Sequence, residues 1–459
     1  MDFTPHTEED LAAMLDAVGA GSVDELFEHI PHGLRPTRPL DLPAGRSEDE
    51  VLGRLAELAA RNRTDAVCFA GGGAYDHYVP AVVGAVVSRG ELLTSYTPYQ
   101  PEVSQGMLQA LFEYQTAVCE LTGLPVANAS LYEGASAVAE GASLACAATR
   151  RGKVVVSGGL DAPSRQVLRT YVHPRGWAVE TAPLDPGSGR SRVAVLDDAT
   201  GALVVQQPNA LGVVEDVRAH AEAAHAAGAK LVVKLDPTTV GVLARPGGQG
   251  ADVVVGEGQG LGQGLSYGGP TFGFLACTDD QVRRLPGRVV GQTVDARGRR
   301  GYVMTLRARE QDIRRERATS NICTNQTLNA VAAGVYLAWL GPGGLVELGR
   351  ACLSRAHAAA RRLSRVEGVE PAVEGPFLKE FPLRLDVADP AAAVDALHDA
   401  GYLVGPVVPD GPAAGAVLVA LTERRTAAQV EGLARALAEV VSAGPPAGAG
   451  RPALVGDRG

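Results

Sequence analysis

The sequence predicts an α/β fold in which helices cover both faces of a parallel sheet. Four short runs rich in valine favour strands buried on both faces, because continuous apolar runs of this length are typical of such strands. These runs are residues 153–158, 202–207, 230–236 and 252–258. The alanine-rich segment 215–228 lies between two of them and ends in a glycine, which predicts a helix and therefore a βαβ unit.

Residues 1–60 predict a helical arm that leads into this fold. Three pairs of residues have the spacing of a capping box, in which a side chain at a helix start and one three residues later satisfy backbone N–H groups reciprocally. The pairs are Thr7 with Asp10, Ser22 with Glu25 and Ser47 with Glu50. Apolar residues at helical spacing follow each pair, so three helices are expected.

Two domains and a tail are expected after the arm. A large α/β domain is predicted over residues 61–340 and a small C-terminal α/β domain over 341–445, where strand-like and helix-like segments alternate again. The run Gly-Pro-Gly-Gly at 341–344 separates two predicted helices. Residues 446–459 are rich in glycine, proline and alanine and predict a disordered tail.

Composition and charge exclude several classes of function. The chain has 459 residues, 46% of them hydrophobic, and a net charge of −10, which disfavours nucleic acid or an anionic membrane as the main partner. No apolar run reaches about 18 residues and the N-terminus is acidic, so neither a membrane span nor a secretory signal is predicted. Six cysteines occur without any C-x-x-C pair, which indicates buried thiols in a reducing cytoplasm and no metal site.

A glycine-rich stretch, residues 253–274, follows a predicted strand and invites a nucleotide-binding interpretation. The G-x-G-x-x-G pattern cannot be laid on Gly256, Gly258, Gly260, Gly262 and Gly264, and no Walker motif is present. We therefore expect these glycines to permit a close backbone approach or a tight turn.

Two segments resemble the cofactor site of pyridoxal-phosphate enzymes of the aspartate-aminotransferase type. Gly134, Ala135 and Ser136 open a helix of small residues, and the free N–H groups of a helix start can hold the cofactor phosphate. A tight turn before a close-packed helix explains these three residues equally well. Asp236 ends a predicted parallel strand, at the place where an aspartate of that enzyme class pairs with the pyridinium nitrogen.

The lysine that this chemistry requires is missing from the expected place. It should follow Asp236 by about 20–25 residues to form the Schiff base, but residues 253–269 contain no lysine. Lys234 lies two residues before Asp236 on the same face of the strand, and neither it nor Lys230 belongs to the loop that the geometry requires. The sequence therefore predicts a pyridoxal-phosphate scaffold whose own site is degenerate and silent.

The most distinctive blocks of the sequence are residues 74–83, 95–116, 128–136, 250–262 and 285–326. With them the chain resembles, over essentially its whole length, subunit 1 of the two-subunit P-protein of the glycine cleavage system, glycine dehydrogenase (decarboxylating). The resemblance implies a pyridoxal-phosphate-dependent transferase fold (fold type I) and a subunit 2 that carries the lysine and the pyridoxal 5'-phosphate. It also implies an α2β2 heterotetramer that decarboxylates glycine, releases CO2 and passes the aminomethyl group to the lipoyl arm of the H-protein.

The chain departs from the usual wording of that family at three places. Tyr132-Glu133 stands where an aspartate is frequent, Gln263-Gly264 lies in the glycine stretch, and in Leu378 to Phe381 an asparagine usually precedes the glutamate. These departures leave the subunit assignment intact and are expected to affect only details of the substrate channel.

Three segments are candidates for contact with a partner. The stretch SYTPYQPEVSQG, residues 95–106, is stiffened by two prolines. We expect its side chains to lie at the subunit junction, at the mouth of the partner's active site, although the loop could also pack only on its own subunit. The side chains are Tyr96, Tyr99, Gln100 and Glu102.

Arg315 and Asn321 lie in a charged and then polar segment, which either faces an acidic partner or a carboxylate-bearing ligand, or is simply solvated. His77 follows a glycine turn, and an orienting role for it is favoured over a catalytic one. Two other functions remain open at this point. One is a regulatory or scaffolding protein with the same fold, and the other is an autonomous enzyme that uses Lys234 or Lys230, which the missing loop lysine disfavours.

Overall fold

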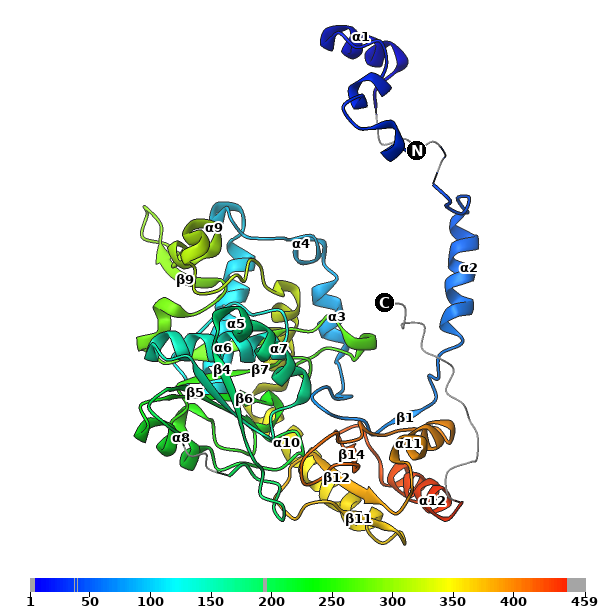
Figure 1. Cartoon of the computed structure of the whole chain (residues 1–459), viewed down its shortest axis with the longest axis vertical. Helices are drawn as coiled ribbons and strands as arrows, with labels where there is room; N and C mark the ends of the chain where they lie inside the picture. Colours follow the sequence, from blue (N-terminus) through cyan, green and yellow to red (C-terminus); the bar gives the residue numbers. More distant parts are fainter. Residues whose placement is uncertain (1–4, 37, 39, 193–195, 444–459) are drawn as a thin grey trace. The chain divides into compact units, whose positions relative to one another are not determined.

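The computed structural model describes residues 5–36, 38, 40–192 and 196–443. The chain forms two compact units, residues 1–64 and residues 65–459, and each is described by itself (Figure 1). The tail predicted at residues 446–459 lies outside the described residues.

The first unit contains two α-helices, and both begin with a predicted capping box. α1 (Glu8–Val18) follows Thr7 and α2 (Glu48–Ala59) follows Ser47, and in each case both reciprocal hydrogen bonds are present. Neither helix has a buried residue. The caps therefore stabilise the starts of both helices.

The α-helix expected after Ser22 does not form. The segment makes only a short 3-10 helix, η1 (Asp24–Phe27). Pro31 follows soon afterwards, and the residue before a proline avoids the α region, so too few residues remain for an α-helix to propagate.

A seven-stranded sheet forms the centre of the second unit. Its order is β2-β8-β7-β6-β5-β3-β4, with β3 to β7 parallel and β8 antiparallel to both of its neighbours. The four valine-rich runs form β3 (Lys153–Ser157), β5 (Thr200–Gln207), β6 (Lys230–Leu235) and β7 (Val253–Glu257), as predicted. The other strands are β2 (Val126–Ala127), β4 (Ala178–Ala182) and β8 (Gly273–Cys277).

Helices cover both faces of the sheet, and each face has its own core. α6 (Gly134–Thr149) and α7 (Ala162–Val172) pack on one face, whereas α5 (Gln105–Thr122), α8 (Val217–Ala226) and the first half of α10 pack on the other. Residues of β6 alternate between the two cores, with Val232 on the α6 side and Val233 on the other. Lys234 therefore points to the α6 and α7 side, and Asp236 lies just beyond the carboxyl end of the strand.

A smaller α/β domain follows at the C-terminal side. β11 (Val369–Pro371), β12 (Glu380–Leu385) and β14 (Val417–Ala420) form an antiparallel sheet, and α11 (Pro390–Asp399) and α12 (Ala427–Ala443) pack in the same core. β1 (Val67–Cys68) pairs in parallel with β13 (Tyr402–Leu403). The first residues of the range 61–340 are thus joined to the smaller domain, so the chain crosses between the domains twice.

The long helix α10 (Thr327–Leu363) connects the two domains. The loop expected at residues 341–344 is only a kink, where Gly341 has a φ of 61° and the helix continues after it. Among the described helices, α10 alone is long and apolar enough to cross a membrane. It is broken at Gly341 and packs against α3 (Ala81–Val87), α5 and α12.

The remaining elements lie at one end of the large domain. β9 (Val289–Val294) and β10 (Arg300–Thr305) form an antiparallel hairpin, followed by the short helix α9 (Gln311–Arg314). The four-residue helix α4 (Gly90–Leu93) precedes the loop 95–104 (Figure 1).

Close contacts explain the glycine-rich stretch. A Cβ atom on Gly256 would lie 2.3 Å from the Leu235 carbonyl oxygen, and one on Gly258 would lie 2.0 Å from the Phe272 ring. These glycines therefore permit the close backbone approach that the sequence suggested.

Replacing Gly258 by alanine should lower the free energy of unfolding by about 1–3 kcal/mol, because the new methyl group must displace the fully buried Phe272 ring. Gly264→Ala is the matched control. Its Cβ would meet nothing closer than Ser266 Oγ at 3.6 Å, so its effect should stay below about 0.5 kcal/mol. Urea denaturation followed by circular dichroism measures both changes, and equal effects would contradict the close-contact explanation.

Candidate functional site

Carboxylates of this chain accept hydrogen bonds from the free backbone N–H groups at the start of α6. Ala135 and Ser136 donate their backbone N–H groups to Glu133 at 2.5 and 2.9 Å, and Gly134 donates to Glu257 at 2.9 Å. The Ser136 hydroxyl group also donates to Glu133. These are the N–H groups that the sequence analysis predicted as a phosphate site. A phosphate there would have to compete with the two carboxylates for the same N–H groups.

The carboxylate of Asp236 is paired within the chain. Lys379, from the smaller domain, forms an ion pair with it at 2.6 Å. The Lys379 ammonium group also donates to Thr238 Oγ1 at 2.9 Å and lies 3.6 Å from the centre of the Tyr75 ring. Burial by itself would raise the pKa of Asp236, but the charge and hydrogen bond of Lys379 hold that pKa below its ordinary value.

All four lysines of the chain are held in ion pairs. The pairs are Lys153 with Asp197, Lys230 with Asp252, Lys234 with Asp161 and Lys379 with Asp236. A lysine that forms a Schiff base must bring its amine to the cofactor, whereas each of these ammonium groups is engaged by a carboxylate of the chain. Lys234 also donates to Ser164 Oγ at 2.9 Å, on the α7 side of the sheet. These contacts disfavour an autonomous enzyme that uses Lys234 or Lys230.

The cavity between these groups is too small for a pyridine ring. It measures about 40 Å³, room for roughly three or four water molecules. Its wall includes Tyr75, Lys234, Asp236, Glu257, Lys379 and Glu380. The residues of this chain therefore do not fit pyridoxal phosphate, because its phosphate position, its pyridinium partner and its space are all taken.

Glu380 ties the segment that follows β1 to the smaller domain. Its carboxyl group accepts the Gly72 N–H at 2.6 Å and the Tyr75 hydroxyl at 3.0 Å. Burial raises the pKa of Glu380 to about 7, and burial also raises the pKa of Tyr75 well above its ordinary value. The Tyr75 hydroxyl therefore stays protonated and remains a donor to Glu380.

His77 is buried and holds its loop in place. Its Nδ1 lies 2.7 Å from a Glu423 carboxylate oxygen, and its Nε2 lies 3.1 Å from Lys379 Nζ. Because an ammonium group can only donate, Nε2 accepts that hydrogen bond and Nδ1–H donates to Glu423. Burial and the Lys379 charge lower the pKa of His77, which favours the same neutral ring. These contacts are compatible with the predicted orienting role, which stays a prediction.

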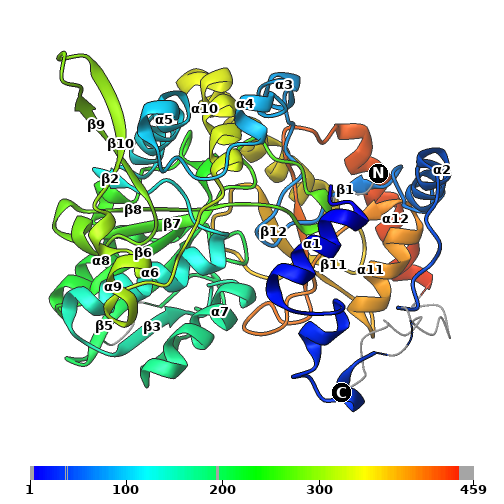
Figure 2. The ribbon, with the colours of Figure 1, turned by 90° about the horizontal axis from the view of Figure 1, so that it is seen from above.

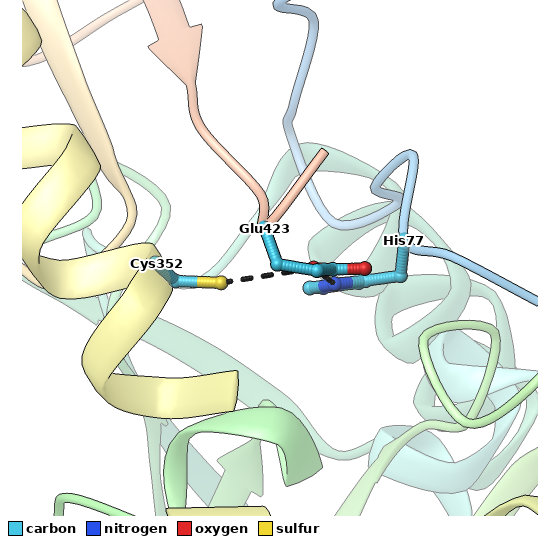
Figure 3. A group of neighbouring side chains, drawn as sticks. All are labelled: His77, Cys352 and Glu423. Carbon is cyan, nitrogen blue, oxygen red and sulfur yellow. Dashed lines mark hydrogen bonds and ion pairs between the residues drawn. The ribbon is translucent and has the colours of Figure 1, made fainter. Parts of the chain in front are cut away.

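Cys352 completes a group with the composition of a metal site (Figure 3). Its Sγ lies 4.0 Å from a Glu423 carboxylate oxygen, and the ligand atoms of His77, Cys352 and Glu423 all lie within 4.8 Å of one another. A cation is disfavoured because Nδ1 of His77 carries a proton and Lys379 is already adjacent. Burial also raises the pKa of the Cys352 thiol to about 12. The group is a hydrogen-bonded contact between the domains.

Tyr99 joins two of the predicted surface segments. The guanidinium groups of Arg288 and Arg307 lie 5.6 and 5.4 Å from the centre of its ring. Arg288 is only 4% exposed and donates to Asn325 Oδ1 at 3.3 Å, and Asn325 donates to Ser130 Oγ at 3.0 Å. The loops 95–104 and 319–326 are thus fastened to each other and to the approach to α6.

The other predicted contact residues lie at the surface. Tyr96 is 73% exposed, and Gln100 and Glu102 of the same loop are exposed too. Arg315 and Asn321 line one cleft of about 480 Å³ together with neighbouring residues that include Tyr171 and Arg175. Arg315 has a φ of 54°, a left-handed conformation that is uncommon for residues other than glycine.

Sequence reasoning did not single out four residues that shape the site: Glu133, Glu257, Arg288 and Lys379. A signal existed for two of them, because Glu133 and Lys379 lie in segments where the sequence departs from the family wording. The departures were expected to affect only a substrate channel, whereas these residues satisfy the polar groups of the remnant cofactor site. Glu257 and Arg288 carry no such local signal.

Comparison with known proteins gives consistent matches along the chain. The family model for the glycine cleavage system P-protein matches residues 1–437. A probable glycine dehydrogenase (decarboxylating) subunit 1 from Desulforamulus reducens is 46% identical over 449 residues, which cover 96% of this chain and 100% of that protein. A protein of the same name from Geotalea daltonii is 47% identical over 444 residues, which cover 95% of this chain and 99% of that protein.

Solved structures agree with these matches. A crystal structure of glycine decarboxylase (P-protein) of the glycine cleavage system, in inhibitor-bound form, has 48% sequence identity and a TM-score of 0.89, and the match covers 96% of this chain and 100% of that one. The sphingosine-1-phosphate lyase of Burkholderia pseudomallei has a TM-score of 0.64 at 17% identity, over 90% of this chain and 94% of that one, which shows the fold alone. The predicted fold class, a pyridoxal-phosphate-dependent transferase of fold type I, is confirmed.

Replacing Lys379 by methionine should destabilise the protein by about 3–5 kcal/mol at pH 7, because the Asp236 carboxylate stays largely buried without its partner. In the wild type, the lowered pKa of Asp236 contributes stability above its unfolded pKa that is lost as the pH falls through the folded pKa. In the variant, protonation of Asp236 relieves the buried charge, so the difference between the two proteins should shrink from pH 7 towards pH 4.

The matched control is the double variant Lys379→Met/Asp236→Asn, which removes both charges and should recover most of the lost stability. Urea denaturation across this pH range measures all three proteins. A loss in Lys379→Met that neither falls at low pH nor recovers in the double variant would contradict the role given to the ion pair.

Proposed function

This chain belongs to the glycine cleavage system P-protein family, as a subunit 1 of glycine dehydrogenase (decarboxylating). On that premise we propose that it contributes residues to an active site that lies in a second subunit. The name of its relatives, subunit 1, implies such a partner. The fold family is one of pyridoxal-phosphate enzymes. We propose that subunit 2 carries the Schiff-base lysine and pyridoxal 5'-phosphate, and that this chain binds none.

The filled remnant site is the observation that best supports this proposal. The first three N–H groups of α6 are hydrogen-bonded to carboxylates, and all four lysines are ion-paired. A chain of this kind contributes to glycine decarboxylation by shaping and closing a cleft rather than by reacting. In this proposal its own residues bind, orient and exclude water at the junction with subunit 2.

The loops 95–104 and 319–326 are the parts of this chain that we place at that junction. Tyr99, Arg288 and Asn325 link them, so they form one stiff wall rather than two separate loops. Tyr96, Gln100, Glu102 and Asn321 are exposed on these loops and available to the partner. Arg315 is exposed just before the second loop and is available as well. In this proposal His77 is a positioning residue, hydrogen-bonded to Glu423 and Lys379.

We further propose the assembly expected from the family resemblance. Two copies of this chain and two of subunit 2 form an α2β2 heterotetramer, and the lipoylated H-protein receives the aminomethyl group as CO2 is released. The six free cysteines suit a reducing compartment, and we place the assembly in the cytoplasm.

Exchange of the glycine carboxyl group with labelled bicarbonate tests whether the active site belongs to subunit 2 and needs this chain. With lipoylated H-protein and pyridoxal phosphate present, this chain alone should show no exchange, and the mixture with subunit 2 should show it. Borohydride reduction of the active mixture should fix the pyridoxyl group on subunit 2, as read by mass spectrometry. A label on Lys234 or Lys379 would contradict the proposal. A subunit 2 as active alone as in the mixture would favour the scaffold alternative.

Tyr99→Ala should lower the exchange rate of the assembled enzyme by about tenfold or more, because Arg288 loses the ring that holds it and the wall loosens. Tyr99→Phe is the matched control. It keeps the ring and loses only a weak hydrogen bond of 3.4 Å to Arg288, so its rate should stay within about threefold of wild type. Gel filtration confirms that both variants assemble, and equal rates in the two variants would argue against the wall.

A further inference from the structure

Residues 283–317 form a strongly basic segment of an acidic protein. They include eleven arginines and four acidic residues, a net charge of +7, whereas the whole chain carries −10. The other residues together therefore carry −17. Such a separation of charge creates a local potential that attracts an oppositely charged surface over distance.

The hairpin of β9 and β10 presents part of this charge to the solvent. Figure 2 shows the hairpin projecting from the large domain. Arg297, Arg299 and Arg300 lie at its turn and are exposed. Arg299 is paired with Asp295 at 2.8 Å, but Arg297 and Arg300 form no ion pair with any residue that the structure describes. Their charges are therefore available to a partner.

A polar cleft lies beside the hairpin. It measures about 710 Å³, and its walls come from the hairpin and from the start of α5. Arg299 and Arg300 line it together with the carboxylates of Glu102 and Asp295, so its charged side chains balance. Pro101 and Glu102 line it as well, and both belong to the loop that we place at the mouth of the partner's active site. A protein seated on the hairpin would thus also border that mouth.

We propose that the β9–β10 hairpin, with its exposed Arg297 and Arg300, is the docking surface for a carboxylate-rich face of the lipoyl-carrying H-protein. The inference rests on the proposed function, which makes that protein a substrate that binds and leaves in every turnover. Exposed charges speed encounter without requiring a permanent contact, whereas an obligate subunit interface is larger and more apolar. The charged, polar surface therefore suits the transient partner better than it suits subunit 2.

The double variant Arg297→Glu/Arg300→Glu tests this in the assembled enzyme. With lipoylated H-protein as the varied substrate, its KM should rise about tenfold at low ionic strength, because two attractive charges become repulsive. The kcat should stay within about twofold of wild type. In about 0.5 M salt the difference in KM should fall to about threefold or less, because salt screens exposed charges.

Two controls isolate the effect of the hairpin charge. Arg218→Glu changes the charge on α8, away from the hairpin in Figure 1, and should leave KM within about twofold. Arg297→Lys/Arg300→Lys keeps both charges and should do the same. Thermal unfolding confirms that every variant is folded.

Three outcomes would overturn the inference. A KM unchanged by Arg297→Glu/Arg300→Glu, with normal turnover, would remove the docking surface and leave the proposed function intact. Loss of assembly with subunit 2 in gel filtration would assign the hairpin to the subunit interface instead. A wild-type mixture that is inactive with H-protein would remove the proposed function itself, and the inference with it.

Discussion

The ion pair between Lys379 and Asp236 constrains how the two domains of the second unit meet. Lys379 comes from the smaller domain, Asp236 follows β6 in the large one, and both side chains are largely buried. A buried ion pair contributes little net stability, because both charges lose their hydration, yet leaving one partner alone is costly. The pair therefore favours the single arrangement in which the Lys379 ammonium group reaches Asp236, Thr238 and His77 together.

The same need to pair buried charges explains how a scaffold of this fold can remain stable with no coenzyme bound. A helix start and a strand-end aspartate are polar groups that need partners whether or not a ligand is present. Here the carboxylates of Glu133 and Glu257 stand where a phosphate would be needed, and the ammonium group of Lys379 stands where a pyridinium would be. The protein thus supplies negative charge at the position of the cofactor phosphate and positive charge at the position of the pyridinium.

The sequence predicted the sheet because its signal is local. A valine run such as Val253 to Val255 predicts a buried strand without reference to any other segment. The alanine-rich helix between two strands is likewise predicted from its own residues. The filled site depends on contacts between distant parts of the chain. Gly134 and Glu257 are 123 residues apart and Tyr99 and Arg288 are 189 apart, so no pattern in one segment reveals either pair. Lys379 was visible as one of four lysines, but only the fold shows that it faces Asp236.

In the proposed assembly, a chain that carries no reacting group would control the reaction through the precision of the surface it offers. Misplacement of a contact by about 1 Å can cost a hundredfold in rate, so a wall beside a reacting centre must be rigid. Rigidity requires that every buried polar group behind the wall be satisfied, since a half-satisfied network relaxes towards water or other partners. The hydrogen bonds of Arg288 and Asn325 meet this requirement within the wall, and those of His77, Glu380 and Lys379 meet it where the two domains join. In the proposed assembly two different sets of residues share these tasks: Glu133, Glu257 and Lys379 occupy the cofactor positions of this chain, whereas Tyr99, Arg288 and Asn325 hold the loops that would face the cleft of the partner.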